Sequence, residues 1–390
     1  MNGRWAIRRL ALGRLRSGTG SQMAAIVLSA DIYSRTDSAV WLSATFFLTF
    51  GISGLLNPVA GLIADRFDRR HVMVASDVAG AIVWTILLLG NSPAWLLALG
   101  FLGSVVLQPF WIASRAAVPN LVAEDDLAWA NGTIAVAGNT ARVLGPVLGG
   151  AIAGLLSARY AYAANAASFI VSALLVLSVT TRFQAVREET EEPGTIWTGF
   201  RVIFADPVLR ALTVVWTVLF LTIDVAIVAD LLISRAFGWG IFGYGLINAF
   251  FGGGALLGAF VARKLSVRME APGVLAEVLG VGVGYGMVAI APAFAVVLAG
   301  QTVASGTDAV GEVAGTNIVQ RASADSVRGR VFGAIGALGL GANAVGVMFA
   351  GFIVQPIGPR WTYGLCALVS VAAAPLLFPS FTRKHTDVAS

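Results

Sequence analysis

Residues 61–70 read GLIADRFDRR and place five charged side chains within the six positions from Asp65 to Arg70. An apolar run of about twenty residues precedes this decapeptide and another follows it, so each run is long enough to cross a bilayer as a helix. In a soluble chain, a run of charges is usually a solvated turn. Between two membrane-length runs, it predicts a turn at a membrane surface.

The composition of the 390-residue chain favours a membrane protein throughout. Hydrophobic residues make up 57% of the chain and charged residues 12%, with a mean hydropathy of +0.82. Soluble domains carry roughly a quarter charged residues, so lipid rather than water must cover most of this exterior. The pI near 9.8 does not indicate nucleic acid, because the basic residues are scattered over many short loops and form no stripe.

Cysteine and histidine are too scarce for a clustered site. The chain has one cysteine, Cys366, and two histidines, His71 and His385, neither of which falls within a predicted span. We therefore expect no disulfide framework, no metal site, no cofactor and no enzyme site. The early arginines at positions 4, 8 and 9 are not followed by a signal-peptide core and cleavage site, so they predict a retained cytoplasmic arm.

Apolar segments bounded by charges, proline or glycine predict an all-α membrane protein with twelve transmembrane helices. The expected helix starts lie near Leu15, Ala39, Val72, Trp95, Leu127, Tyr160, Val208, Phe242, Val274, Ala293, Gly329 and Tyr363. The first span is the most polar of the twelve, which suggests a helix that faces a polar interior more than lipid.

The distribution of lysine and arginine predicts the orientation. With the N-terminus in the cytoplasm, 21 of the 26 basic residues fall on the inner side, four on the outer side, and Arg142 within a span. Basic loops stay in the cytoplasm, so this bias predicts a multi-pass protein of the cytoplasmic (inner) membrane with both termini cytoplasmic.

The longest hydrophilic stretch, roughly residues 182–206, separates two halves of six predicted helices. We predict an N-terminal bundle over residues 1–184, a cytoplasmic linker over 185–206 and a C-terminal bundle over 207–390. The halves repeat weakly, since Gly61–Arg66 matches Gly258–Arg263 with the carboxylate lost, and Ala123–Leu127 matches Ser323–Val327. Two related six-helix bundles are the architecture of a rocking transporter with a central site.

Several motifs resemble those of one transporter family. A signature loop is matched by Gly61, Asp65, Arg66, Arg69 and Arg70, with Asp68 where the motif usually has glycine. An antiporter-associated motif of the fifth helix is matched by Gly145, Pro146, Gly149 and Gly150. Further matches are Val118–Val122, and Gln320 and Arg321 followed by Arg328–Phe332. Over essentially its whole length the chain resembles the major facilitator superfamily, and it is similar to the enterobactin-exporter and macrolide-efflux branch.

The resemblance implies a conformational latch at the signature loop. Asp65 would hold the start of the eleventh helix when the cytoplasmic side is closed, because a carboxylate is stabilised by a helix N-terminus and by Arg328 or Arg330. Asp77 lies seven residues after Arg70, on the same helix face, and could hold an arginine of the loop. The latch set is Gly61, Asp65, Arg66, Arg69, Arg70 and Asp77. The alternative is that these arginines only set topology.

Charges within the spans are the candidates for proton coupling. Arg142 lies about 15 residues into the fifth helix and needs a carboxylate, a carbonyl or the amide of Asn139 as a partner. Asp308 and Glu312 are four residues apart on one helix face, which suits a proton carrier. The candidates are Asp224, Asp308, Glu312 and Arg142. The alternative is a structural role, and Asp31, Asp230 and Glu277 are expected at wet helix ends.

The resemblance implies that the first, fourth, seventh and tenth helices line a central cavity. The candidate substrate contacts on those helices are Gln22, Gln108, Trp111, Trp216 and Gln301. Such a lining would suit an amphipathic or cationic compound, although each side chain could equally be ordinary packing. The fifth-helix glycines predict a close approach to a neighbouring helix, which is also compatible with plain packing.

Together these features predict a secondary active transporter that exports a drug-like or natural-product small molecule, siderophores included, by proton antiport with alternating access. No segment matches the nucleotide-binding pattern GxxxxGK[ST], so the proton gradient rather than ATP is the expected energy source. The expected partners are a small-molecule substrate and the bilayer, without nucleic acid, and the expected state is a monomer. The alternatives are an uptake or facilitative carrier, or a transport-inactive membrane sensor.

Overall fold

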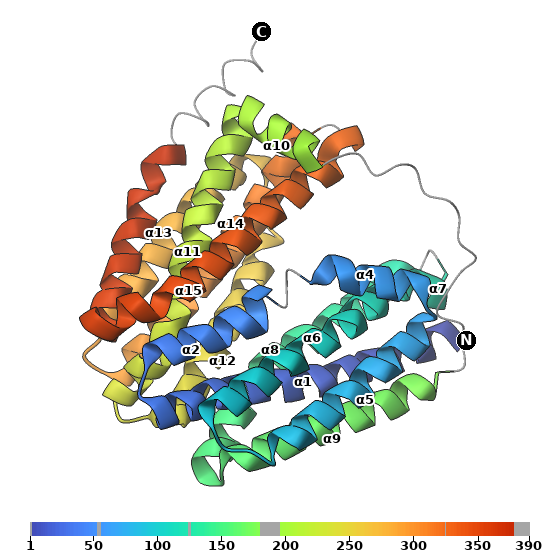
Figure 1. The fold of residues 1–390 in the computed structure, drawn as a ribbon. Helices are drawn as coiled ribbons and strands as arrows, with labels where there is room; N and C mark the ends of the chain where they lie inside the picture. Colours follow the sequence, from blue (N-terminus) through green and yellow to red (C-terminus); the bar gives the residue numbers. More distant parts are fainter. Residues whose placement is uncertain (1, 53–55, 124–125, 180–195, 324, 378–390) are drawn as a thin grey trace. The chain divides into compact units, whose positions relative to one another are not determined.

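The computed structural model describes residues 2–52, 56–123, 126–179, 196–323 and 325–377, and helices are the regular secondary structure throughout these ranges (Figure 1). The N-terminal elements are α1 (Asn2–Thr36), α2 (Ala39–Phe46), η1 (Phe47–Ile52), α4 (Asn57–Arg66), α5 (Arg69–Leu87), α6 (Pro93–Ala116), α7 (Val118–Leu121), α8 (Leu127–Leu155) and α9 (Ala158–Leu177). The later elements are α10 (Ile196–Ala205), α11 (Pro207–Ala236), α12 (Gly240–Ala262), η3 (Val267–Met269), α13 (Glu270–Ala289), α14 (Phe294–Ala322), α15 (Asp325–Ala372) and η4 (Ala374–Leu377).

The chain folds into two compact units. Unit 1 comprises Met1–Glu189 with Trp239–Ala249, and unit 2 comprises Thr190–Gly238 with Phe250–Ser390. Helix α12 therefore begins in unit 1 and continues in unit 2. Within the predicted linker, residues 196–205 form α10, whereas residues 185–195 lie outside the described ranges.

Seven helices of the described ranges are long and apolar enough to cross a membrane. They are Arg69–Leu87, Pro93–Ala116, Ala158–Leu177, Pro207–Ala236, Gly240–Ala262, Val267–Ala289 and Arg330–Leu377. Helices α1, α8 and α14 are also long, with 35, 29 and 29 residues, but they carry more polar side chains. At 1.5 Å per residue, a 29-residue helix is about 43 Å long, which exceeds the thickness of the hydrocarbon core.

Two of the helical rods are interrupted. Helix α2 runs on into the π-helix η1, and α4 is the next described helix, which we count as part of the same rod. Helix α15 consists of two arms that meet at Gly358, whose φ of 80° lies in the left-handed region that favours glycine. Counted in this way, the described residues form twelve rods, six before α10 and six after it, which confirms the predicted fold class.

Eleven of the twelve rods begin within four residues of the predicted starts, and the first does not. Helix α1 starts at Asn2 rather than near Leu15, so the expected N-terminal arm is wrong: its arginines belong to the first turns of a helix. Arg4 donates a hydrogen bond of 2.7 Å to Asp126 and lies over the ring of Trp129. The hydrogen bond from the Arg4 guanidinium lowers the pKa of the Asp126 carboxyl, and it fixes the start of α1 to the start of α8.

Inside unit 1, α1 packs against α8 and α9, and α5 packs between α6 and α9 (Figure 1). Trp84, Tyr162 and Phe169 are buried in its core, with the rings of Trp84 and Tyr162 5.7 Å apart. The Tyr162 hydroxyl donates to Asp31, which also pairs with Arg35 at 2.7 Å. This buried carboxylate thus joins α1 to α9.

Inside unit 2, α11 packs against α15, and α13 packs against both α14 and α15. A Cβ atom on Gly284 of α13 would lie 2.7 Å from the backbone nitrogen of Ala304, so these two helices approach at their backbones. The only cysteine of the chain, Cys366, is 2% exposed in the second arm of α15.

Candidate functional site

The turn at residues 61–70 joins α4 to α5, and Asp68 caps the second of these helices. Its Oδ1 atom accepts hydrogen bonds from the backbone nitrogens of Arg70 at 3.0 Å and His71 at 3.2 Å. These are two of the donors that a helix N-terminus leaves unsatisfied. The departure from glycine at this position, which the motif alone did not explain, is therefore a helix cap.

Two arginines of the turn hold the ends of other helices in unit 1. Arg69 donates to the carbonyl of Ala116 at the end of α6, at 2.8 Å, and Arg70 donates to the carbonyl of Leu177 at the end of α9. Carbonyls at a helix C-terminus carry partial negative charge, so a guanidinium is well placed there. Arg69 and Arg70 thus tie α5 to both of its neighbours.

The other members of the expected latch are placed as follows. Asp65 lies in the last turn of α4, and its side chain is outside the described part of the structure. Arg66 follows it with its guanidinium 6.0 Å from the ring of Phe67, and a Cβ on Gly61 would meet no atom within 4 Å. The role of these residues as a latch stays a prediction.

Asp77 is fully buried in α5, with Ser172 of α9 as a polar neighbour. Neither of its carboxylate oxygens accepts a hydrogen bond of normal geometry from a described residue. The arginines that it was expected to hold, Arg69 and Arg70, instead donate to helix-end carbonyls.

Unit 1 contains a pocket of about 1010 Å³ lined by residues of α1, η1, α4, α5, α6 and α8. Three of the predicted substrate contacts line it, namely Gln22, Gln108 and Trp111, together with Arg142. Asn131 and Asn139 add two further amides, and Leu28, Leu107 and Ile134 add apolar wall. This mixture of apolar surface and a few polar groups is typical of a small-molecule site.

Two further arginines line the pocket. From the sequence, both were interpreted only as determinants of membrane topology. Arg14 of α1 is buried, donates to the Ser114 hydroxyl at 2.6 Å and lies 5.0 Å from the centre of the Trp111 ring. Arg115 lines the same pocket from the end of α6. If the first helix had been predicted to begin at Asn2, Arg14 would have fallen within a span and would have been a candidate site residue.

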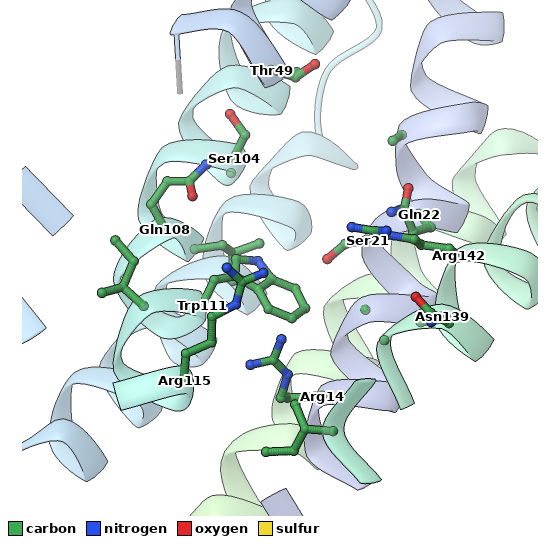
Figure 2. Close-up of a pocket in the computed structure, with 18 of the residues that line it drawn as sticks. Arg14, Ser21, Gln22, Thr49, Ser104, Gln108, Trp111, Arg115, Asn139 and Arg142 are labelled. Carbon is green, nitrogen blue, oxygen red and sulfur yellow. The ribbon is translucent and has the colours of Figure 1, made fainter. Parts of the chain in front are cut away.

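Arg142 reaches into the pocket from α8 (Figure 2). It is exposed on the pocket wall and forms no ion pair or hydrogen bond within the described ranges, so the protein partner expected for it is absent there. Figure 2 shows the guanidinium groups of Arg14, Arg115 and Arg142 pointing into the space between α1, α6 and α8.

The predicted antiporter-like motif forms helix contacts behind this pocket. A Cβ on Gly145 would lie 2.5 Å from the Cβ of Gln22, and one on Gly149 would lie 2.8 Å from the carbonyl oxygen of Met23. A Cβ on Gly150 would lie 3.0 Å from the carbonyl oxygen of Ile241. The close approach expected of these glycines is therefore present, with Pro146 inside α8 between them.

In unit 2, two aspartates of α11 make hydrogen bonds across the bundle. Asp224 accepts from the Asn343 amide at 2.8 Å, and its other oxygen has no partner in the described part of the chain. Asp230 accepts from the Gln301 amide at 2.8 Å and from the Tyr363 hydroxyl. Gln301 is therefore in the buried core of unit 2, and it is not among the lining residues of the pocket in unit 1.

Glu277 of α13 is 2% exposed and accepts from the indole nitrogen of Trp216 at 3.4 Å. Its carboxylate packs directly against Gly311 of α14, between the positions of Asp308 and Glu312. Asp308 is half-buried and Glu312 is exposed. Three carboxylates thus lie along one contact between α13 and α14. The indole of Trp216 donates a hydrogen bond to one of them, Glu277.

The expectation of wet helix ends for Asp31, Asp230 and Glu277 is wrong. All three are buried, with exposures of 8%, 5% and 2%. Each accepts a hydrogen bond from a side chain of another helix. Position along a helix does not predict this result, because hydrogen bonds from neighbouring helices stabilise a carboxylate away from water.

The sequence profile of the Major Facilitator Superfamily matches residues 10–229 and 225–389 of this chain. Multidrug resistance protein MdtG of Citrobacter koseri is 31% identical over 152 residues, which is 38% of this chain and 37% of that protein. The match thus spans little more than a third of MdtG. BacE of Bacillus subtilis, whose name assigns it to bacilysin export, is 25% identical over 332 residues and 81% of each chain.

Solved transporter structures share the fold. The nucleoside transporter NupG superposes with a TM-score of 0.76 at 14% identity, over 96% of this chain and 99% of NupG. A bacterial homologue of the human lysosomal transporter Spinster superposes with a TM-score of 0.70 at 16% identity, over 97% and 95%. At these identities the likeness concerns architecture.

Proposed function

The chain belongs to the Major Facilitator Superfamily, and from this premise we propose that it exports a drug-like or natural-product small molecule in exchange for protons. The family and the named relatives are membrane transporters, so the chain is a multi-pass membrane transporter and not an enzyme. Export, proton antiport and a place in the inner membrane with cytoplasmic termini are the finer parts of the proposal.

One observation carries the proton part of the proposal: unit 2 holds carboxylates inside the membrane-length helices without a cation beside them. Within the described ranges, Asp224 accepts a side-chain hydrogen bond from the Asn343 amide alone, and Glu277 accepts one from the Trp216 indole alone. An ionised carboxylate buried without a cation is costly, whereas a protonated one is tolerated. Such groups would take up protons when the protein closes around them and release them when water enters.

The pocket and the relatives support the export of a small molecule. A volume of about 1010 Å³ is at the upper end of the usual range for a drug-sized ligand. MdtG is named for multidrug resistance and BacE for bacilysin export, and these names favour the export of a small organic molecule by this chain. Uptake and a transport-inactive sensor are the outcomes that the following test separates.

The test uses the purified full chain in proteoliposomes that contain a pH-sensitive dye. Dyes, macrolides, siderophores and aromatic acids are added one at a time, and at least one of them should cause a proton flux that the pH-sensitive dye reports. The same compound should accumulate in the proteoliposomes when a pH gradient is imposed. Asp224→Asn and Glu277→Gln, which neutralise the two carboxylates described above, should abolish the coupled proton flux, and so should Asp308→Asn and Glu312→Gln at the contact that Glu277 makes. Asp37→Asn is the matched control, because Asp37 is exposed in the turn before α2 and has a φ of 47°, which asparagine accepts.

The outcomes are distinct. Substrate movement without proton flux would support a facilitative carrier and contradict antiport. Coupled flux that is unchanged in both Asp308→Asn and Glu312→Gln would remove these residues from the mechanism. Binding without any movement would favour a sensor.

A further inference from the structure

We propose that the pocket of unit 1 binds the anionic group of an organic anion. The inference rests on the proposed transport function and names the chemical class of its substrate. Arg14, Arg115 and Arg142 line the pocket, and no aspartate or glutamate is among its described lining residues. A cavity with three guanidinium groups and no carboxylate attracts negative charge and repels cations.

Arg14 shows that the positive charge is built into the fold. It is 5% exposed, is held by Ser114 and lies over the Trp111 ring, yet its Nε atom has no hydrogen-bond partner in the described ranges. The charge of Arg115 acts unfavourably on that of Arg14. A bound anion would offset this repulsion and accept the donors left over.

The other two arginines present their donors to the pocket. Neither Arg115 nor Arg142 forms an ion pair or a hydrogen bond with a described residue. Other arginines of the described chain do have protein partners: Arg4, Arg35 and Arg321 pair with carboxylates, and Arg69 and Arg70 donate to carbonyls. The planar fork of a guanidinium matches a carboxylate or phosphate group through two parallel hydrogen bonds.

The other lining residues indicate which groups the rest of the ligand would carry. Trp84, Trp111, Leu28 and Leu107 offer aromatic and aliphatic surface to an apolar body. The amides of Gln22, Gln108, Asn131 and Asn139 can bind neutral polar substituents of that body. We therefore infer an amphipathic anion, whereas the sequence alone had suggested an amphipathic or cationic compound.

The test compares probes of one shape and different charge on the full chain in phosphatidylcholine nanodiscs at neutral pH. The probes are naphthoate, the neutral naphthamide and the cationic naphthylmethylammonium, with benzoate and anthracene carboxylate to vary the size. At least one carboxylate should bind at least about tenfold more tightly than its amide or its ammonium analogue, as expected for a charge-assisted hydrogen bond.

Matched variants assign this preference to the arginines. Arg115→Gln and Arg142→Gln should each weaken carboxylate binding by about tenfold or more and leave amide binding within about twofold. Arg201→Gln is the control, because Arg201 lies exposed on α10 and does not line the pocket. Arg14 is not used, since its contacts with Ser114 and Trp111 also support the fold.

Three results would overturn the inference: no binding by any carboxylate, equal or tighter binding of the amide or the ammonium, or unchanged binding in both arginine variants. Loss of carboxylate binding in discs that contain phosphatidylglycerol would support an anion site and identify a lipid phosphate, rather than a soluble carboxylate, as its occupant. A cation that exchanges for protons would refute this inference and leave the transport proposal intact. A carboxylate that binds but never crosses the membrane would support this inference and contradict the transport proposal.

Discussion

The signature turn has a structural task and a proposed conformational task, and different residues of the turn carry them. Asp68 caps α5, whereas Arg69 and Arg70 hold the carbonyl ends of α6 and α9. All three contacts lie within unit 1, so they stabilise one bundle. Of the charges in this turn, Asp65 and Arg66 remain as candidates for a contact that changes during transport.

Replacing the cap tests the structural task. Asp68→Ala should lower the free energy of unfolding by about 1 kcal/mol, because two backbone donors lose their acceptor. Asp68→Gly should cost only a few tenths of a kcal/mol, which fits the glycine that related signature loops carry here. Denaturant unfolding of the purified chain in detergent measures both values. Equal losses in the two variants would argue against a capping role.

Replacing the adjacent carboxylate tests the conformational task. Asp65→Asn keeps the size of the side chain and removes its charge, so transport should be abolished while the amount of protein in the membrane fraction is unchanged. Asp68→Asn, which keeps the cap, is the control and should retain transport. Normal flux in Asp65→Asn would refute the latch.

Among the helices, α8 shows most directly how sequence sets packing. Its glycines at 145 and 149 let the backbone of α1 approach, and the same face of α8 presents Arg142 and Asn139 to the pocket. A close contact between backbones therefore helps to position this wall of the pocket. A change in that contact should affect stability and the site together.

A pair of alanine substitutions tests this packing. Gly149→Ala places a Cβ 2.8 Å from the Met23 carbonyl oxygen and should destabilise the chain by about 1–3 kcal/mol through overpacking. Gly132→Ala in the same helix meets no atom within 4 Å, and it should stabilise the helix by up to about 1 kcal/mol. Thermal unfolding of both variants in detergent measures the difference, and changes of the same sign would contradict the close contact.

The long apolar runs made eleven helix starts predictable, because hydrophobic length decides where a chain crosses lipid. The start of the first helix was placed too late for the same reason, since five arginines in its first half interrupt the apolar pattern. Those arginines are accommodated by contacts far away in sequence, such as Arg4 with Asp126 and Arg14 with Ser114. A single sequence does not reveal such pairings.

Across the whole molecule, both units hold charged side chains within their helices. Unit 1 gathers three arginines at its pocket and buries Asp31 and Asp77, whereas unit 2 holds Asp224, Asp230, Glu277, Asp308 and Glu312 in its helices. The sequence identified Arg142 and three of these carboxylates as candidates, but their sorting depends on side-chain direction. The arrangement suits a carrier that holds its cargo in one bundle and its proton in the other.

The burial of Cys366 makes the native chain unreactive toward thiol reagents. It is the only thiol of the 390 residues and is 2% exposed, so water-soluble alkylating reagents cannot reach it while the bundle stays folded. A cysteine placed on the pocket wall, for example at Gly138, would then be the single reactive sulfur. Its rate of alkylation from either side of the membrane would report which side the pocket faces, and the native Cys366 would not have to be removed first.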